Sequence, residues 1–190
     1  MTSHVPRAAG ALLVAAGLAI APIALAADQA SPAATQMGPS EQESRPSDEE
    51  SLAMVHVINQ HEIDSGKLAL TRPAGEPTLA LAKMLVQEHT QNDAMQAKLG
   101  VAPRQTPAVM SLQRQKKAEA DKLAALPPDA FERAYIDAMV KGHTEAKQML
   151  DKRAATASSP QVRTYLVQTR TAVENHLSQA RTLQAAAVGK

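Results

Sequence analysis

Four residues that can bind metal ions or transfer protons fall on the apolar faces of predicted helices. They are Glu62, His89, His143 and His176. His143 is the clearest case, because apolar residues recur at intervals of three and four throughout the surrounding stretch 131–150. A titratable side chain on such a face is either a buried polar group with hydrogen-bond partners or a ligand.

These residue types could form a metal site. Three imidazoles and a carboxylate suit Zn, Fe, Mn or Cu. Glu88, beside His89, is expected either to be a further oxygen ligand or to hold one of the ligands by a hydrogen bond. One interpretation of the sequence is therefore a single metal ion in the core of a helical bundle. A ferritin-type di-iron centre is disfavoured, since it uses Glu-x-x-His, whereas valine stands three residues before each of these histidines.

Two other interpretations fit the same residues. A metal-free layer of His and Glu could fix the register of the helices in an envelope-stress or protein-interaction module. An oxidoreductase using bound iron or manganese would also need an open coordination position and a substrate channel. We assign no catalytic residue, because the sequence shows no nucleophile–base pair, phosphate-binding glycine loop or His-Glu-x-x-His zinc helix.

The pattern of apolar residues predicts four long helices that would carry the site. They cover about 51–71, the segment from the turn at 73–77 to Leu99, 129–156, and 160–187. A charged helix over about 107–126 lies in the long link between the second and third. We expect an all-α fold, a ferritin-like four-helix bundle in which this helix is a crossover along the outside.

In such a bundle, the four candidate residues would lie at similar heights along the bundle axis. At about 1.5 Å per residue, Glu62 and the three histidines lie within about two helical turns of one level. His56 and His61 fall towards the polar flank and the rim of the first helix. We expect both to be ordinary surface groups.

The N-terminal segment is typical of a secretory signal peptide. His4 and Arg7 precede an apolar run that ends in Ala24-Leu25-Ala26, so we expect cleavage after Ala26. A membrane anchor fits less well, because glycine and proline interrupt the run and a span needs about 20 apolar residues. Residues 27–50, rich in Pro, Ser, Gln and acids, are expected to be a disordered linker. The mature protein would be periplasmic, with a bundle domain at 51–187 and no transmembrane span.

Composition narrows the range of partners. The chain contains no cysteine, which excludes disulfides and lipoprotein acylation. It has 20 basic and 19 acidic residues, and removal of 1–26 takes away only Arg7, leaving 19 of each. This balance and the scarcity of aromatic residues argue against nucleic-acid binding. An envelope protein or a second copy of the chain is the expected kind of partner.

Several motifs resemble the bacterial domain of unknown function 4142. They are the stretches 62–69, 81–90 and 131–143, together with His176-Leu177. Leu85 and Glu88 stand where that family often has Met and Asp. The resemblance covers about residues 51–186 and implies an exported ferritin-like domain, described as periplasmic or outer-membrane. It implies no established reaction.

Overall fold

The computed structural model describes residues 46–188, and all of its regular structure is helical. The helices are α2 (Asp48–Leu70), α3 (Glu76–Ala97), α4 (Pro107–Ala124), α5 (Pro128–Thr156) and α6 (Pro160–Val188). No strand occurs within this range, so the all-α prediction is confirmed. The predicted signal peptide and most of the predicted linker lie outside the described residues. None of the described helices is long and apolar enough to cross a bilayer.

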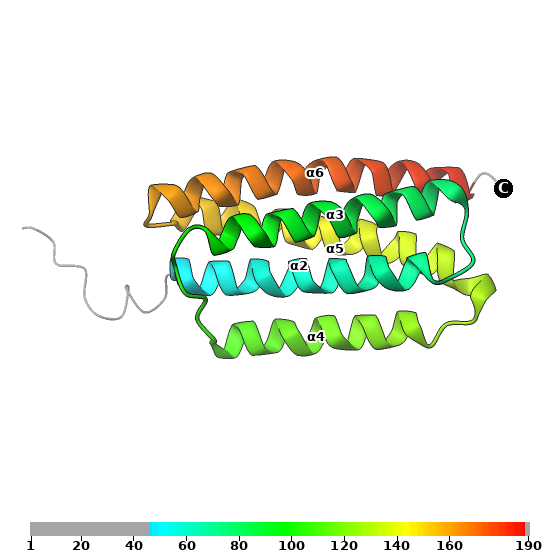
Figure 1. Ribbon diagram of the computed structural model, residues 1–190, viewed down its shortest axis with the longest axis horizontal. Helices are drawn as coiled ribbons and strands as arrows, with labels where there is room; N and C mark the ends of the chain where they lie inside the picture. The colour runs from blue at the N-terminus through cyan, green and yellow to red at the C-terminus, as the bar shows by residue number, and fades with distance from the viewer. Residues whose placement is uncertain (1–45, 189–190) are drawn as a thin grey trace, which may run out of the picture. The chain divides into compact units, whose positions relative to one another are not determined.

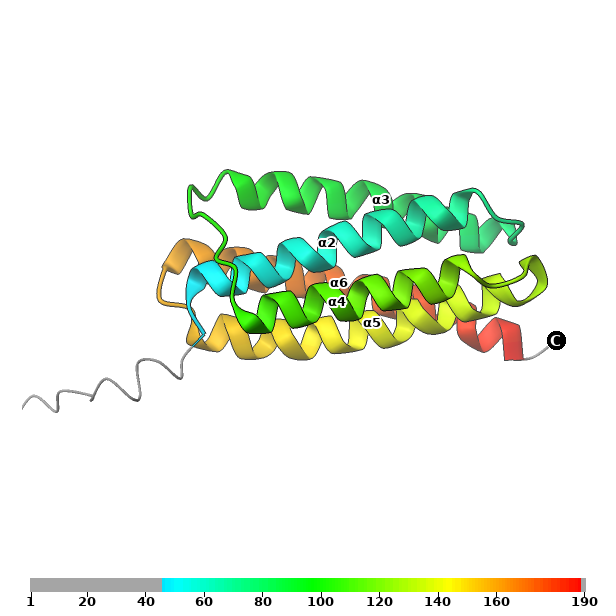
Figure 2. The same ribbon diagram turned by 90° about the horizontal axis from the view of Figure 1, so that it is seen from below.

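The helices form two antiparallel hairpins joined by α4. The first hairpin is α2–α3 and the second is α5–α6 (Figure 1). The connecting helix α4 runs beside α2 and also contacts α5, as the view in Figure 2 shows. Helices α3 and α5 run in one direction, while α2, α4 and α6 run in the other. This order agrees with a long helical link between the second and third long helices.

The first helix begins three residues earlier than predicted, because Ser47 caps it. The Ser47 side chain accepts a hydrogen bond from the Glu50 backbone N–H. Asp48, Glu49 and Glu50 therefore occupy the first turn, where carboxylates favour the positive end of the helix dipole. The Asp48 carboxylate also accepts hydrogen bonds from the backbone N–H groups of Ser158 and Ser159. These contacts tie the start of α2 to the turn between α5 and α6.

Two of the three apolar clusters among the described residues fill the bundle, one towards each end, and the third lies between α2 and α4. The first includes Leu52, Leu150 and Leu166. The second includes Leu85, Phe131 and Tyr135. On α2, α5 and α6 the candidate residue lies between the stretches that build these two clusters. On α3 the second cluster precedes His89, and Leu99 and Val101, just beyond the helix, reach the first. The histidines therefore form a polar layer between two apolar layers, which hold the surrounding helices in place.

The hairpin α2–α3 depends on the absence of a side chain at Gly66. A Cβ atom there would lie 2.7 Å from Val86 Cγ2 and 3.0 Å from the Ala82 carbonyl oxygen. We expect Gly66→Ala to lower the free energy of unfolding by about 1–3 kcal/mol in urea titrations, despite alanine's helix propensity. Gly142→Ala is the matched control, because its nearest contact would be an ordinary 3.4 Å. Equal stability of the two variants would contradict the proposed close approach.

Candidate metal centre

Three histidines from three helices converge in the polar layer. His89 on α3, His143 on α5 and His176 on α6 are each 2% exposed. Their ring centroids are 5.2–5.8 Å apart. One potential ligand atom from each ring lies within 4.8 Å of the other two. We call these three residues the histidine triad.

Each ring of the histidine triad uses one nitrogen to donate a hydrogen bond to an oxygen atom. His89 Nδ1 donates to Asn59 Oδ1 (2.9 Å), His143 Nδ1 to the Met139 carbonyl oxygen (2.9 Å), and His176 Nε2 to Glu88 Oε2 (2.8 Å). An imidazole that donates through one nitrogen carries a lone pair on the other when it is neutral. Outer hydrogen bonds of this kind orient histidines that bind metal ions.

The remaining nitrogen of each ring is buried and unpaired. His89 Nε2, His143 Nε2 and His176 Nδ1 have no hydrogen-bond partner within residues 46–188. A buried polar atom without a partner is costly, so three of them in one layer require an explanation. A cation would supply one, because all three lone pairs could bind it.

Burial keeps the three rings neutral. It lowers the pKa of His143 to about 4, against the opposing effect of the bond to Met139. Burial also lowers the pKa of His89 well below its usual range, and the two neighbouring histidines add to this shift. The pKa of His176 is lowered by burial too, although the bond to Glu88 acts in the opposite direction. At neutral pH the histidine triad therefore presents lone pairs rather than charges.

Glu62 lies beside the histidine triad, on the side of the hydrogen-bonded nitrogen of His143. Its Oε1 is 4.0 Å from His143 Nδ1, and the carboxyl group is buried. Burial raises the pKa of Glu62, while the nearby charges of His61 and Lys116 act against this. Its Oε2 has no partner in the described part of the chain. The structure thus brings the three predicted histidines together and leaves Glu62 adjacent to them.

Glu88 contacts the hydrogen-bonded nitrogen of His176 and not the unpaired one. Its carboxylate accepts the hydrogen bond from His176, and its side chain is 44% exposed. Asn59 and Met139, which hold the other two rings, are both buried. Glu88 is therefore the one outer partner of the histidine triad that reaches solvent.

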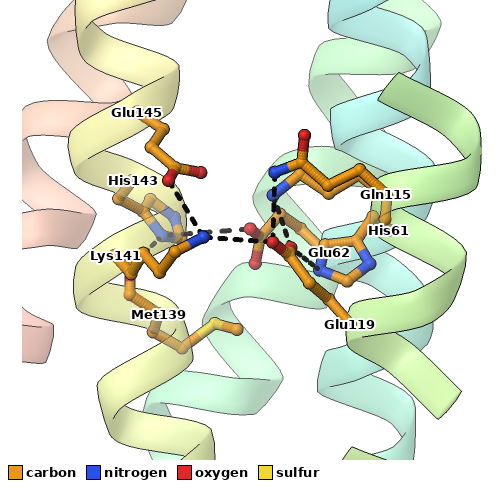
Figure 3. A network of polar contacts seen from close by, with 9 residues as sticks. His61, Glu62, Gln115, Glu119, Met139, Lys141, His143 and Glu145 are labelled. Atoms are coloured by element: carbon orange, nitrogen blue, oxygen red, sulfur yellow. Dashed lines mark hydrogen bonds and ion pairs between the residues drawn. The ribbon is translucent and has the colours of Figure 1, made fainter. Parts of the chain in front are cut away.

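A charged network on α4 and α5 borders the site next to Glu62 (Figure 3). Lys116 Nζ donates to Glu119 Oε2 at 2.8 Å, and Lys141 Nζ donates to Glu119 Oε1 at 3.1 Å. Burial would raise the pKa of Glu119, but the hydrogen bonds from Lys116 and Gln115 outweigh it and lower that pKa to about 2. Lys116 itself is only 6% exposed. The charged residues around Lys116 are typical of a solvated helix face, so the sequence did not predict that its side chain is buried.

The prediction that His61 lies at the surface is wrong, whereas the same prediction for His56 is confirmed. Helix α4 packs on α2 and contributes Glu119 next to His61, which is 9% exposed. The side chain of His56 is 47% exposed and contacts Asp93 on α3. Gly142 on α5 faces the same part of α2 and α4. A Cβ atom at that position would lie 3.4 Å from Glu62 Oε1 and 4.0 Å from Lys116 Nζ.

The fold and the site together define a helical-bundle protein with a buried cluster of neutral imidazoles. The chain belongs to the family described as Domain of unknown function (DUF4142), which matches residues 31–183. This confirms the resemblance seen in the motifs. No curated protein matches the chain.

One solved structure is similar in fold. It is the crystal structure of a presumed secreted protein, DUF305, from Streptomyces coelicolor. The two share 17% sequence identity with a TM-score of 0.62, over 74% of this chain and 94% of the other. At this identity the likeness shows the arrangement of helices alone.

Proposed function

We propose that this protein is an exported, ferritin-like helical bundle that binds one divalent transition-metal ion at His89, His143 and His176. The observation that carries the proposal is the set of three buried lone pairs with no donor among the described residues. Leaving such groups unpaired costs about 1–3 kcal/mol each. A bound ion would remove that cost at all three nitrogens.

The hydrogen-bond directions favour a metal site over a metal-free layer. Rings that stabilised one another would pair a donor nitrogen of one with an acceptor nitrogen of the next. Here each ring donates to an oxygen outside the histidine triad instead. The structural alternative, an envelope-stress or interaction module, leaves this arrangement unexplained.

The three nitrogen ligands narrow the choice of metal ion. Imidazole nitrogens suit Zn²⁺ and Cu²⁺, whereas Mn²⁺ prefers oxygen ligands. Zn–N bonds of about 2.0–2.1 Å imply that tetrahedral ligand nitrogens are about 3.4 Å apart. The ligand atoms lie within 4.8 Å, so an ion would draw the three rings closer together. Three protein ligands would leave one position for water or for Glu62 after a change of rotamer.

The proposed location rests on the N-terminal residues. The apolar run and the Ala24-Leu25-Ala26 pattern support export to the periplasm. The description of the Streptomyces coelicolor protein as a presumed secreted protein is consistent with this. Association with the outer membrane, an envelope partner or a second copy of the chain extends the same proposal. We propose no reaction.

Titration calorimetry of the chelator-treated mature chain, residues 27–190, tests the metal site. We expect one ion per chain, with affinity in the order Cu²⁺ above Zn²⁺ above Co²⁺ above Mn²⁺ for an imidazole set. Mg²⁺ serves as the control cation and is expected not to bind, because it requires oxygen ligands. Failure of Cu²⁺, Zn²⁺ and Co²⁺ to bind would leave the histidine triad as a packing layer.

A further inference from the structure

The interface between α3 and α6, which we call the α3–α6 seam, is polar along much of its length. On one face of α3, every fourth residue from Met84 to Gln96 makes a polar contact with a residue of the antiparallel helix α6. The contacts are Met84 Sδ with Gln179 Nε2 (3.3 Å), Glu88 with His176 (2.8 Å), Asn92 with Thr169 (3.1 Å), and Gln96 with the Tyr165 hydroxyl (3.3 Å). Water can replace such hydrogen bonds at little net cost, so this seam can part more easily than an apolar one.

Glu88 stands where this seam meets both solvent and the histidine triad. Its side chain is 44% exposed, whereas that of His176 is 2% exposed. The His176 ring joins the two environments, since Nε2 donates to Glu88 and the unpaired Nδ1 lies in the core. A single side chain therefore separates a surface carboxylate from the buried lone pairs.

We infer that a divalent transition-metal cation enters and leaves the histidine triad through the α3–α6 seam, with the Glu88 carboxylate as its first ligand. This inference rests on the proposed metal site. Glu88 takes the cation from solvent and releases the His176 ring. Rotation of that ring then carries the cation to the lone pairs of His89 and His143. When the cation is bound, Glu88 again accepts the hydrogen bond from His176.

A second approach to the site is less suited to a cation. A cavity of about 460 Å³ between α2, α4 and α5 reaches Gly142, behind which Glu62 lies. Three basic residues line it, Lys116, Lys152 and Arg153, against the single carboxylate of Glu145. Glu119 and Glu50 pair with Lys116 (2.8 Å) and Arg153 (2.7 Å), so Lys152 is the lining cation without an ion pair among the described residues. Its charge would repel an approaching divalent cation. The α3–α6 seam carries Glu88 instead, without a basic side chain among its four contacts.

Stopped-flow measurement of Co²⁺ or Zn²⁺ binding to the full mature chain tests this route. Glu88→Gln keeps an oxygen that can accept from His176 but removes the negative charge. We expect its association rate to fall about 10-fold, since local charge changes on-rates by at least this factor. The dissociation constant should change less than threefold, because the three nitrogen ligands remain. Glu88→Asp should restore most of the rate.

Glu174→Gln is the matched control for a change in net charge. Glu174 lies on α6 two residues before His176, with a side chain 37% exposed, and pairs with Lys147 and Arg170. We expect its association rate to match that of the wild type. Gly142→Ala, whose added methyl group would narrow the inner end of the other cavity at an ordinary contact distance, should also leave the rate unchanged.

Two outcomes would overturn the route while leaving the metal site intact. One is a wild-type association rate in Glu88→Gln. The other is slow binding in Gly142→Ala with normal binding in Glu88→Gln, which would assign the route to the cavity beside Glu62. Absence of binding by the wild-type chain would instead refute the metal site itself.

Discussion

Replacing His143 by alanine is expected to abolish the stabilisation of this protein by Zn²⁺ or Cu²⁺. With free metal at 1,000 times the dissociation constant, the wild type should gain about 4 kcal/mol in free energy of unfolding. The variant keeps two of three nitrogen ligands and should gain less than about 1 kcal/mol under the same conditions. Without metal, loss of the buried ring should cost about 1–3 kcal/mol. Urea titrations with and without metal measure both effects.

His56→Ala is the control for loss of a histidine from the same bundle. His56 lies on α2, is exposed and contacts Asp93 rather than the histidine triad. Its variant should keep the full metal-dependent gain. If His143→Ala kept that gain while His56→Ala lost it, the ion would bind at the surface pair of His56 and Asp93.

Acidification is expected to destabilise the metal-free protein steeply between pH 7 and pH 5. The folded-state pKa of His143 is about 4, below its ordinary value of 6.5. In this window the unfolded chain therefore binds more protons than the folded chain, and stability falls as pH falls. This ring alone should contribute a loss of roughly 2 kcal/mol between pH 7 and 5.

Other buried groups also determine how the free energy of unfolding changes with pH. His89, His176 and His61 also have lowered pKa values, mainly through burial, and act in the same direction as His143. The raised pKa of Glu62 acts in the opposite direction, because there the folded state holds the proton more tightly. Because four histidines with lowered pKa values oppose one carboxyl group with a raised pKa, we expect the net stability to fall from pH 7 to pH 5.

Chemical denaturation at a series of pH values with chelator present checks this expectation. In the His143→Gln variant, the free energy of unfolding should fall less steeply with falling pH, by about 1.4 kcal/mol per pH unit below pH 6, since one titrating ring is missing. A stability that stays constant from pH 6.5 to 5 would contradict the assignment of neutral, buried rings.

The burial and the common level of the three histidines were predicted mainly from helical periodicity. The spacing of apolar residues around His143 placed its ring in the core, and the same reasoning placed His89 and His176 there. Their common level followed from helix length and the antiparallel order of the hairpins. Periodicity does not encode ring orientation, so the outward hydrogen bonds and the inward lone pairs required the structure.

The environment of Glu62 was harder to predict, because it depends on how α4 packs. Charged residues cover much of α4, and its pattern does not show that Lys116 faces inward. The same packing buries His61. The start of α2 was predicted three residues late, although Ser47 followed by acidic residues is a typical N-terminal cap.

A crystal structure of the zinc-loaded protein, with anomalous data at the zinc edge, tests the central claim most directly. We predict one strong peak per chain, with His89 Nε2, His143 Nε2 and His176 Nδ1 at about 2.0–2.1 Å from it. The outer hydrogen bonds to Asn59, the Met139 carbonyl and Glu88 should persist. A peak only at surface residues, with the three rings hydrogen-bonded to one another or to water, would contradict the account.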